Sequence, residues 1–319
     1  MKPPRKTRVT IHDLGEFGLI RQLQGVVGPA RGSVLLGIGD DCAVLRSDNP
    51  AEYLLYTCDP VVEGVHYRRS DRPRQVGWKA MARNLSDIAA MGGVPCWAVV
   101  SIGLRRDTEA HWVKELYAGL CAAARKFGCQ IVGGDTTHVK HEQFVVVALI
   151  GKVERSRMIL RSGAKVGDSV FVTGTLGGSR RGKHLTFTPR LNEARWLVGN
   201  FPLHAMMDLS DGLSNDLQRL VEASRPGTGL EIHAAEIPIA RAAHGSLTAA
   251  LNDGEDFELL FTIDPRQVTA LRQKWARKFA LELTEIGRVV RSRQKVTLIA
   301  VDGSRKLLAP AGYDHFATR

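Results

Sequence analysis

Strand-like and helix-like patterns alternate along residues 50–153, and this alternation restricts the fold more than any other feature of the sequence. Short apolar runs indicate strands, and apolar residues at helical spacing indicate helices. In chain order the pattern predicts a strand, a helix, a strand, a helix and two strands: Tyr53–Asp59, Gln75–Met91, Cys96–Leu104, Thr108–Phe127 (with Gly128 as its C-cap), Ile131–Val132 and Phe144–Ile150. Such a segment favours an α/β or α+β layer domain.

The second half of the chain predicts a different mixture of elements. Strands are expected at Gly167–Gly174, Gly229–Ile232, Phe257–Ile263, Glu285–Val290 and Val296–Ala300, and helices at Leu191–Val198, Leu213–Ala223 and Arg266–Phe279. The polar stretch Glu154–Arg157 separates the halves. We therefore expect two domains, residues 1–154 and residues 155–319, the second of α+β type.

Cysteine usage and hydropathy indicate a cytoplasmic protein. The five cysteines form no C-x-x-C pair, which favours reduced thiols over disulfides or a zinc site. No apolar run reaches the roughly 18 residues that cross a bilayer, so no membrane partner is expected. The basic N-terminus, Met1 to Arg8, is not followed by the apolar stretch of a secretory signal.

The formal charge of +11, from 44 Lys and Arg against 33 Asp and Glu, suggests anionic partners. The basic residues are scattered, and no aromatic residues interleave with them as a nucleic-acid stacking surface requires. This distribution favours pockets for phosphorylated small molecules and argues against a nucleic-acid partner.

Carboxylates beside Gly, Ser or Thr recur at six places in the sequence. These are Asp40 and Asp41, Asp59, Asp87, Asp135, Asp208 and Asp211, and Glu255 and Asp256. One such residue is most often a turn or a helix cap, but six are hard to explain in that way. The adjacent pair Asp40 and Asp41 repels unless cations neutralise it, and Mg²⁺ prefers oxygen ligands and bridges carboxylates to phosphates. The set therefore points to Mg²⁺–nucleotide chemistry.

Two glycine-rich segments resemble nucleotide-binding motifs and are rejected. Gly177–Lys183 fits the first seven positions of a Walker A loop, but His184 stands where that loop needs a hydroxyl residue. A basic surface loop is the favoured interpretation. Gly37–Cys42 begins like a dinucleotide fingerprint but lacks its third glycine.

Ten ordered motifs together resemble the thiamine-monophosphate kinases, in the aminoimidazole ribonucleotide synthetase-like superfamily of ATP-using enzymes. They are Gly15–Ile20, Gly37–Leu45, Glu63–Tyr67, Val76–Gly93, Ile131–Thr137, Leu160–Asp168, Val172–Gly177, Met207–Leu217, Gly254–Phe261 and Gly312–Phe316. The resemblance implies a homodimer formed through the N-terminal sheet, with ATP near that interface. It also implies transfer of the ATP γ-phosphoryl group to thiamine monophosphate, without a phospho-enzyme.

The resemblance also implies roles for particular residues. Metal ligands would be Asp41, Asp59, Asp87, Asp135, Asp208 and Asp211, with Thr57 and Cys58 or its carbonyl, and Asp40 joins them as the neighbour of Asp41. Asp41, Asp87 and Asp208 would be catalytic. ATP would contact Tyr117, Gly134, Asp135, Arg161 and Ser210. The thiamine side would contact His66, Glu255 and Tyr313.

Simpler interpretations stay open from the residues alone. Asp87 and Asn84 could form an ordinary solvated helix face, His66 could be a structural histidine, and Tyr117 could belong to the core. For the whole chain, the alternatives are another superfamily enzyme with a different acceptor and a basic RNA-binding protein. An RNA surface gains nothing from clustered carboxylates, which argues against the latter.

Overall fold

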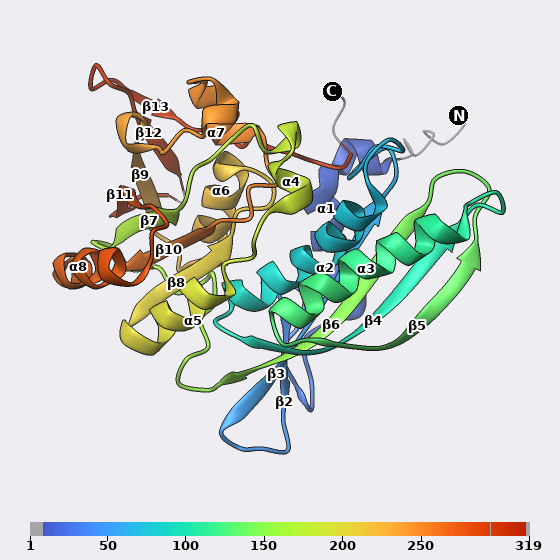
Figure 1. The fold of residues 1–319 in the computed structure, drawn as a ribbon. Helices are drawn as coiled ribbons and strands as arrows, with labels where there is room; N and C mark the ends of the chain where they lie inside the picture. The colour runs from blue at the N-terminus through green and yellow to red at the C-terminus, as the bar shows by residue number, and fades with distance from the viewer. Residues whose placement is uncertain (1–8, 294, 317–319) are drawn as a thin grey trace, which may run out of the picture.

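The computed structural model describes residues 9–293 and 295–316 and contains two β-sheets (Figure 1). The first sheet has the strand order β1-β2-β3-β6-β4-β5. Its strands are β1 (Val34–Leu36), β2 (Ala43–Arg46), β3 (Glu52–Val62), β4 (Val94–Leu104), β5 (Gln130–His138) and β6 (Phe144–Glu154). All neighbours are antiparallel except β4 and β5, which are parallel and joined through a helix.

The second sheet has the order β13-β12-β9-β11-β7-β10-β8. Its strands are β7 (Ser169–Thr173), β8 (Leu203–Asp208), β9 (Thr228–His233), β10 (Leu259–Ile263), β11 (Leu283–Arg291), β12 (Val296–Ile299) and β13 (Arg305–Leu307). The helices of this half are α4 (Lys183–Thr186), α5 (Leu191–Asn200), α6 (Leu213–Ala223), α7 (Leu247–Asn252) and α8 (Val268–Lys278). Two sheets with helices confirm the expected α/β (α+β) class; the exact division at residue 154 stays a prediction.

Helices α2 (Pro73–Ala90) and α3 (Ala110–Lys126) cover one face of the first sheet (Figure 1). They pack closely because each contributes a glycine to the contact. A Cβ on Gly77 would lie 1.9 Å from the Leu116 carbonyl oxygen, and a Cβ on Gly119 would lie 1.9 Å from the Arg74 carbonyl oxygen. Helix α2 also contacts α4, α5 and β8, so it lies between the two halves of the molecule.

The N-terminal helix α1 (Ile11–Val27) is tied to the last described residues of the C-terminal segment, which runs beside it (Figure 1). Its Thr10 N-cap forms a capping box with Asp13. The Glu16 backbone N–H donates to Asp314 at 3.2 Å, and His12 Nδ1 lies 2.9 Å from the Phe316 carbonyl oxygen. The basic segment Met1 to Arg8 lies outside the described residues.

Several predicted elements are correct and several are not. The helix predicted at Leu213–Ala223 is confirmed at both ends as α6. Two predicted strand ends are wrong, because β3 continues past Asp59 to Val62 and β5 continues from Val132 to His138. Strand β3 tolerates Pro60 because β2 pairs with it only as far as Tyr56, which leaves that edge free of ladder bonds. Helix α1 and strand β8 were not predicted.

Within residues 9–293 and 295–316, every helix is too short or too polar to cross a bilayer.

Candidate active site

Three aspartates from three separate elements meet between the two sheets. Asp41 follows β1, Asp87 lies on the last turn of α2, and Asp208 ends β8. One carboxylate oxygen of each lies within 4.8 Å of the others. The sequence placed these residues 46 or more positions apart, and α2 brings them together because it contacts both β3 and β8.

Hydroxyl groups and an arginine orient the three carboxylates. Thr57 Oγ1 donates to Asp87 Oδ2 at 2.5 Å, and Ser86 Oγ donates to Asp208 Oδ2 at 2.5 Å. Arg161 Nη2 donates to Asp41 Oδ1 at 2.6 Å. Asp41 Oδ2 is buried and has no hydrogen-bond partner among the described residues. Each carboxylate is therefore fixed, and one oxygen of the group faces the others unpaired.

The pKa values of these carboxyl groups are raised. Burial and the charge of Asp41 raise the pKa of Asp208 to about 7. Burial, together with the charges of Asp59, Asp208 and Asp41, raises the pKa of Asp87 well above its usual value. Burial likewise raises the pKa of Asp41, although Arg161 opposes the shift. The group thus has too little positive charge around it to be fully ionised without further cations.

Asp40 lies beside this group and is held by Arg161. The Arg161 backbone N–H donates to Asp40 Oδ2 at 3.2 Å, and its Nε lies 3.4 Å from Asp40 Oδ1. Burial and the neighbouring charge of Asp41 raise the pKa of Asp40 to about 7. Arg161 therefore serves as the counter-ion of both adjacent aspartates.

The other predicted metal ligands are not part of this group of three. Asp59 faces the same side of β3 as Thr57 and pairs with Arg83 Nε at 2.9 Å. The Cys58 side chain is exposed on the opposite face of β3, so only its carbonyl could serve this site. Asp211 pairs with Arg219, and Asp135 is exposed within β5.

Besides Arg161, the residues predicted to contact ATP lie in different parts of the structure. Gly134 has φ +156°, and a Cβ there would lie 1.9 Å from the Val100 carbonyl oxygen, so the approach of β5 to β4 requires glycine. Tyr117 packs against the core under the first sheet. The Ser210 carbonyl oxygen accepts a hydrogen bond from the Glu255 backbone N–H at 2.6 Å.

Asn84 is completely buried, so the interpretation of Asn84 and Asp87 as a solvated helix face is wrong.

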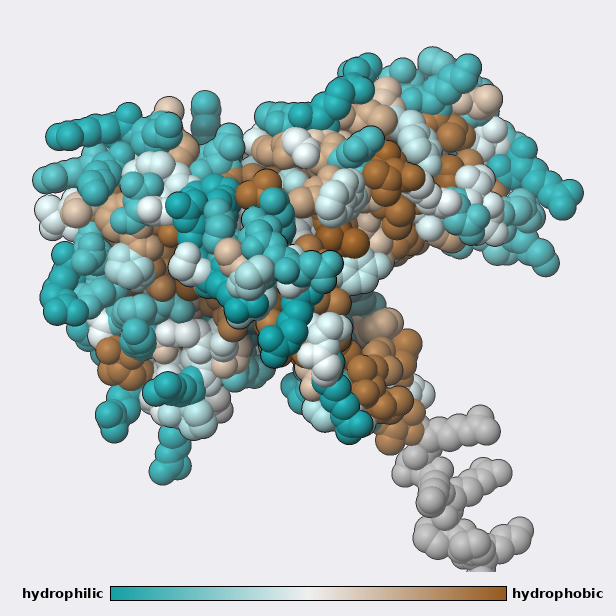
Figure 2. All heavy atoms as spheres, turned by 90° about the horizontal axis from the view of Figure 1, so that it is seen from below, coloured by the Kyte–Doolittle hydropathy of each residue, from teal (hydrophilic) through white to brown (hydrophobic). Residues whose placement is uncertain are grey.

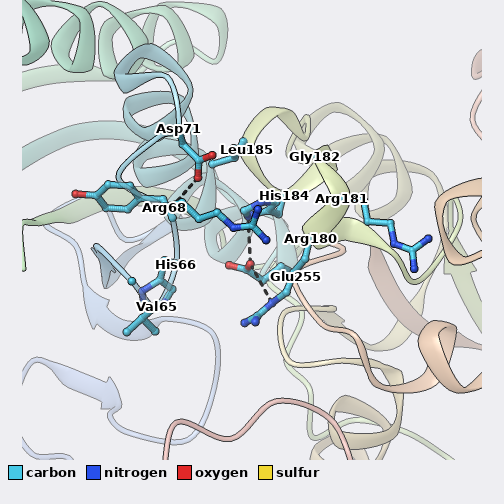
Figure 3. A pocket seen from close by; sticks show the side chains of 12 residues that line it. Val65, His66, Arg68, Asp71, Arg180, Arg181, Gly182, His184, Leu185 and Glu255 are labelled. Atoms are coloured by element: carbon cyan, nitrogen blue, oxygen red, sulfur yellow. Dashed lines mark hydrogen bonds and ion pairs between the residues drawn. The ribbon is translucent and has the colours of Figure 1, made fainter. Parts of the chain in front are cut away.

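A cavity of about 470 Å³ lies next to Glu255 (Figure 3). It is lined by His66, Arg68, Arg180, Arg181, His184 and Glu255, among others. A second cavity of about 610 Å³ is lined by Phe17, Asn215 and Tyr313, and Arg180 lines both. The predicted thiamine-side residues thus share one cationic region, although His66 and Tyr313 line different cavities.

Glu255 lies in the middle of a basic cluster. Its carboxylate is 2.6 Å from Lys79 Nζ, 3.4 Å from His184 Nδ1, 3.6 Å from Arg83 Nη1 and 3.9 Å from Arg180 Nε. Burial acts to raise its pKa, but the positive charges of Lys79 and Arg83 outweigh burial and hold the pKa below the usual range. Cations outnumber the one carboxylate here, so this cluster suits an anionic ligand.

The backbone at Glu255 is strained. Its φ is +57°, in the left-handed region that favours glycine, and its N–H is held by Ser210. Phe257 has φ +51° and donates its N–H to the Leu209 carbonyl oxygen. Strain of this kind persists where the surrounding structure enforces it, typically at functional sites.

Tyr313 lies on the C-terminal segment that returns to α6 and α1. Its backbone N–H donates to the Asp211 carbonyl oxygen at 2.8 Å, and its ring centroid lies 5.0 Å from the Arg180 guanidinium. The His315 ring lies 5.4 Å from the His66 ring. The segment therefore brings Tyr313 beside Arg180 and His315 beside His66, at the two cavities.

The Walker-like segment Gly177–Lys183 has no free phosphate cradle. The Gly177 N–H donates to Asp256 at 2.9 Å, and the Gly178 N–H donates to Asp253 at 2.7 Å. Lys183 Nζ pairs with the buried Glu258 at 3.0 Å. The protein's own carboxylates take up the donors that would otherwise bind phosphate.

Sequence reasoning missed Lys79, Arg83, Ser86 and His184. The first three repeat at intervals of four and three residues on α2, as a polar stripe beside the buried apolar residues of that helix. That stripe was the available signal, because buried charges require partners. His184 served in the sequence analysis only as evidence against a Walker A loop.

The aspartate group fits Mg²⁺ by the chemistry of its donors. All donors are oxygens, the carboxylates repel one another, and Asp41 Oδ2 is a buried oxygen without a partner. No His or Cys contributes to the group, so a zinc-type site does not fit.

Comparison with known proteins identifies the family. Residues 39–153 match the N-terminal domain of AIR synthase related proteins, and residues 161–299 match their C-terminal domain. The thiamine-monophosphate kinase of Rhodopirellula baltica is 38% identical over 272 residues, covering 81% of this chain and 84% of that protein. The thiamine-monophosphate kinase of Aquifex aeolicus is 36% identical, covering 96% of this chain and 99% of that protein.

A solved structure agrees with this grouping. AaThiL complexed with AMPPCP and TMP superposes with a TM-score of 0.82 and 34% identity, covering 97% of this chain and 100% of that chain. The chain therefore belongs to the AIR synthase related family and, within it, to the thiamine-monophosphate kinases.

Proposed function

We propose that this protein is a Mg²⁺-dependent kinase that transfers the γ-phosphoryl group of ATP to thiamine monophosphate, yielding thiamine diphosphate and ADP. The convergence of Asp41, Asp87 and Asp208 carries the proposal. Relatives over most of the chain are named thiamine-monophosphate kinases, and a similar solved structure is complexed with AMPPCP and TMP.

On the ATP side, the chain's own residues would bind and orient charge. Asp41, Asp87 and Asp208 would hold Mg²⁺, which neutralises phosphate oxygens when bound, and Asp40, Asp59, Asp135 and Asp211 would be further ligands. Arg161 supplies a guanidinium at the same place, and Thr57 and Ser86 fix the carboxylates. Gly134, Tyr117 and Ser210 would contact the nucleotide. Phosphoryl transfer requires mainly such alignment and neutralisation.

On the acceptor side, the basic cluster around Glu255 would attract the phosphate of thiamine monophosphate. Arg68, Arg180 and Arg181 line the cavity and supply the positive charge, and His66, Glu255 and Tyr313 would contact the rest of the molecule. The acceptor oxygen belongs to a phosphate that is largely ionised at neutral pH, so no general base is needed. We therefore propose direct in-line transfer without a phospho-enzyme.

The identity of the product tests this function. The protein is incubated with γ-labelled ATP, Mg²⁺ and thiamine monophosphate, and the label should appear in the terminal phosphate of thiamine diphosphate. Without acceptor, the protein should stay unlabelled, and free thiamine should be a poor acceptor. ATP turnover without thiamine diphosphate would refute the acceptor and favour another enzyme of the superfamily. A labelled protein would refute direct transfer.

We also propose that the chain forms a homodimer through the uncovered face of the first sheet. Helices α2 and α3 cover the other face, and large apolar side chains stand outward on β3, β4 and β5. Trp97 is 50% exposed and Val132 is 55% exposed. From below, apolar side chains gather on the part of the molecule that carries this sheet (Figure 2). A contiguous apolar face of this kind marks a protein interface, and a second copy covers it symmetrically.

Sedimentation or light scattering tests the dimer. Val99→Glu places a charge on this face and should convert the dimer to a monomer. Val301→Glu, at a position 85% exposed outside that face, is the control and should leave the mass unchanged. A monomeric wild-type protein would refute the proposal.

We further infer a cytoplasmic location, since all five cysteines are free and two of them, Cys42 and Cys129, are buried as thiols. A fractionation that placed the protein in an oxidising compartment would refute this.

A further inference from the structure

The buried ammonium of Lys79 makes two hydrogen bonds and one ion pair. Lys79 is 0% exposed, and its Nζ lies 2.6 Å from the His66 carbonyl oxygen, 2.6 Å from Glu255 Oε1 and 2.9 Å from His184 Nδ1. The His66 carbonyl oxygen and His184 Nδ1 accept hydrogen bonds from the ammonium, and the Glu255 carboxylate balances its charge. Lys79 reaches these atoms from α2, whereas His184 belongs to α4 in the other half of the chain.

These contacts determine which nitrogen of His184 carries its proton. An ammonium has no lone pair, so a contact of 2.9 Å requires His184 Nδ1 to accept. The Glu255 carboxylate also lies near this nitrogen, but at 3.4 Å it is the more distant partner. The ring therefore carries its proton on Nε2, and that N–H is available as a donor.

His66, across the same cavity, is held in the same way. The Val62 backbone N–H donates to His66 Nδ1 at 3.1 Å, which leaves the proton on Nε2. Burial and the charge of Arg83 lower the pKa of His66 to about 3, so its ring is neutral. Both imidazoles line the 470 Å³ cavity (Figure 3).

The helix that carries His184 is fixed from several sides. Lys183 pairs with Glu258, and Leu185 is buried in the core. Phe187 stacks on Phe257 with ring centroids 4.0 Å apart, and its carbonyl oxygen accepts Trp78 Nε1–H at 2.7 Å. The ring of His184 is thus positioned by packing before any ligand arrives, as a specificity residue requires.

We propose that His184 is a specificity-determining residue, which donates a hydrogen bond from Nε2–H to a neutral ring nitrogen of the acceptor, and that Lys79 is the positioning residue that holds this tautomer. The proposal rests on the proposed function. Thiamine monophosphate joins a cationic thiazolium to a neutral aminopyrimidine, whose ring nitrogens accept hydrogen bonds. The surrounding arginines and Lys79 repel the thiazolium, whereas a neutral ring with acceptor nitrogens suits two neutral imidazole donors.

Nitrogen NMR of the wild-type protein tests the tautomer without any activity. In ¹⁵N-histidine-labelled protein, the signals of His184 are assigned by their loss in His184→Gln. We expect the pattern of a neutral ring protonated at Nε2, with the Nε2 signal shifting when thiamine monophosphate is added. In Lys79→Met the pattern should move toward a mixture of tautomers. A doubly protonated ring, or a ring protonated at Nδ1, would overturn the proposal.

Kinetics of two matched variants test the donor. His184→Asn keeps an atom that can accept from Lys79 near the Nδ1 position but has no donor at the Nε2 position. His184→Gln extends its amide to the Nε2 position and can donate there. We expect His184→Asn to raise KM for thiamine monophosphate about tenfold, as expected for one lost hydrogen bond, while KM for ATP changes less than about threefold. His184→Gln should stay within about threefold of wild type on both.

A truncated acceptor separates this proposal from the proposed function. The phosphate of hydroxyethylthiazole lacks the aminopyrimidine, so His184→Asn and wild type should use it equally. An equal loss on both acceptors, or equal effects of Asn and Gln, would mean that His184 has only a structural role. If no thiamine diphosphate forms at all, the proposed function fails, whereas the tautomer measurement still gives its own answer.

Discussion

Two charged clusters flank helix α2, and their charge balance is opposite. Around Asp41, Asp87 and Asp208, carboxylates exceed cations, and the pKa values are raised. Around Glu255, cations exceed carboxylates, and the carboxyl pKa is lowered. Arg83 lies between the clusters, with Nε on Asp59 and Nη1 near Glu255.

This difference shows what each cluster lacks. A group of buried carboxylates becomes favourable when cations bind, and a group of buried cations becomes favourable when an anion binds. A Mg²⁺–nucleotide on one side and a phosphate-bearing acceptor on the other would neutralise both. The excess of negative charge in one cluster and of positive charge in the other is thus complementary to the two substrates of the proposed reaction.

The largest expected effect comes from removing one carboxylate of the acidic cluster. Asp87→Asn should lower kcat by roughly 10²-fold or more, about 2.7 kcal/mol of transition-state stabilisation. The metal-free protein should become more stable, because the substitution relieves repulsion. Steady-state kinetics at saturating Mg²⁺ and thermal unfolding measure the two effects. The exposed Asp48→Asn is the control. Near-wild-type turnover would show that the shared metal site is wrong.

The second effect is the pH dependence of stability without metal. Asp40 and Asp208 have pKa values of about 7, above those of the unfolded chain near 4. Between these limits the folded state binds more protons than the unfolded state, so stability should fall as the pH rises through this window. The slope is about 1.4 kcal/mol per pH unit for each extra proton.

Urea unfolding between pH 5 and 8, with and without Mg²⁺, measures this slope. Mg²⁺ should abolish most of it, and Asp208→Asn should flatten it in the metal-free protein. A metal-free stability that is constant or rises with pH would contradict the charge balance we assign to the acidic cluster.

How far the sequence predicts this site depends on which element carries each residue. The positions of Asp40, Asp41 and Asp87 were recognisable because small neighbours and motif order mark them. The strand that carries Asp208 was missed, because Leu203–Asp208 contains His204 and two methionines and lacks a β-branched run. Asp59 and Asp135 lie inside long strands, because pairing of β3 with β6 and β5 with β4 extends through them.

The charge balance around Glu255 could not be predicted from the sequence. The excess of cations around Glu255 comes from α2, from the 3₁₀ turn at Ser179–Arg181 and from α4, which only the folded chain brings together. A single sequence gives the residue types but not the partners of each charge. The expectation that Glu255 contacts the thiamine side therefore did not include its partners Lys79 and Arg83.

A smaller effect is expected on the basic side. Glu255→Gln removes the one carboxylate of its cluster, so Lys79 and Arg83 lose their shared partner. We expect KM for thiamine monophosphate to rise about tenfold and KM for ATP to change less than about threefold. The exposed Glu142→Gln serves as the matched control. A rise confined to KM for ATP would show that Glu255 acts at the ATP site, which would contradict its assignment to the acceptor site.

The smallest effect is expected at Lys183, which belongs to neither cluster. Its Nζ binds Glu258 and the Thr175 carbonyl oxygen, and Glu258 keeps a bidentate contact with Arg190 at 2.7 Å for each bond. Lys183→Ala should therefore leave kcat within about threefold, whereas a P-loop lysine neutralises phosphate charge directly and its loss is severe. Arg190→Ala, which removes both of its bonds to the buried Glu258, should lower the melting temperature more than Lys183→Ala does. A loss near 10³-fold in kcat for Lys183→Ala would restore the P-loop interpretation of Gly177–Lys183, despite the carboxylates of Asp253 and Asp256 that occupy its backbone donors.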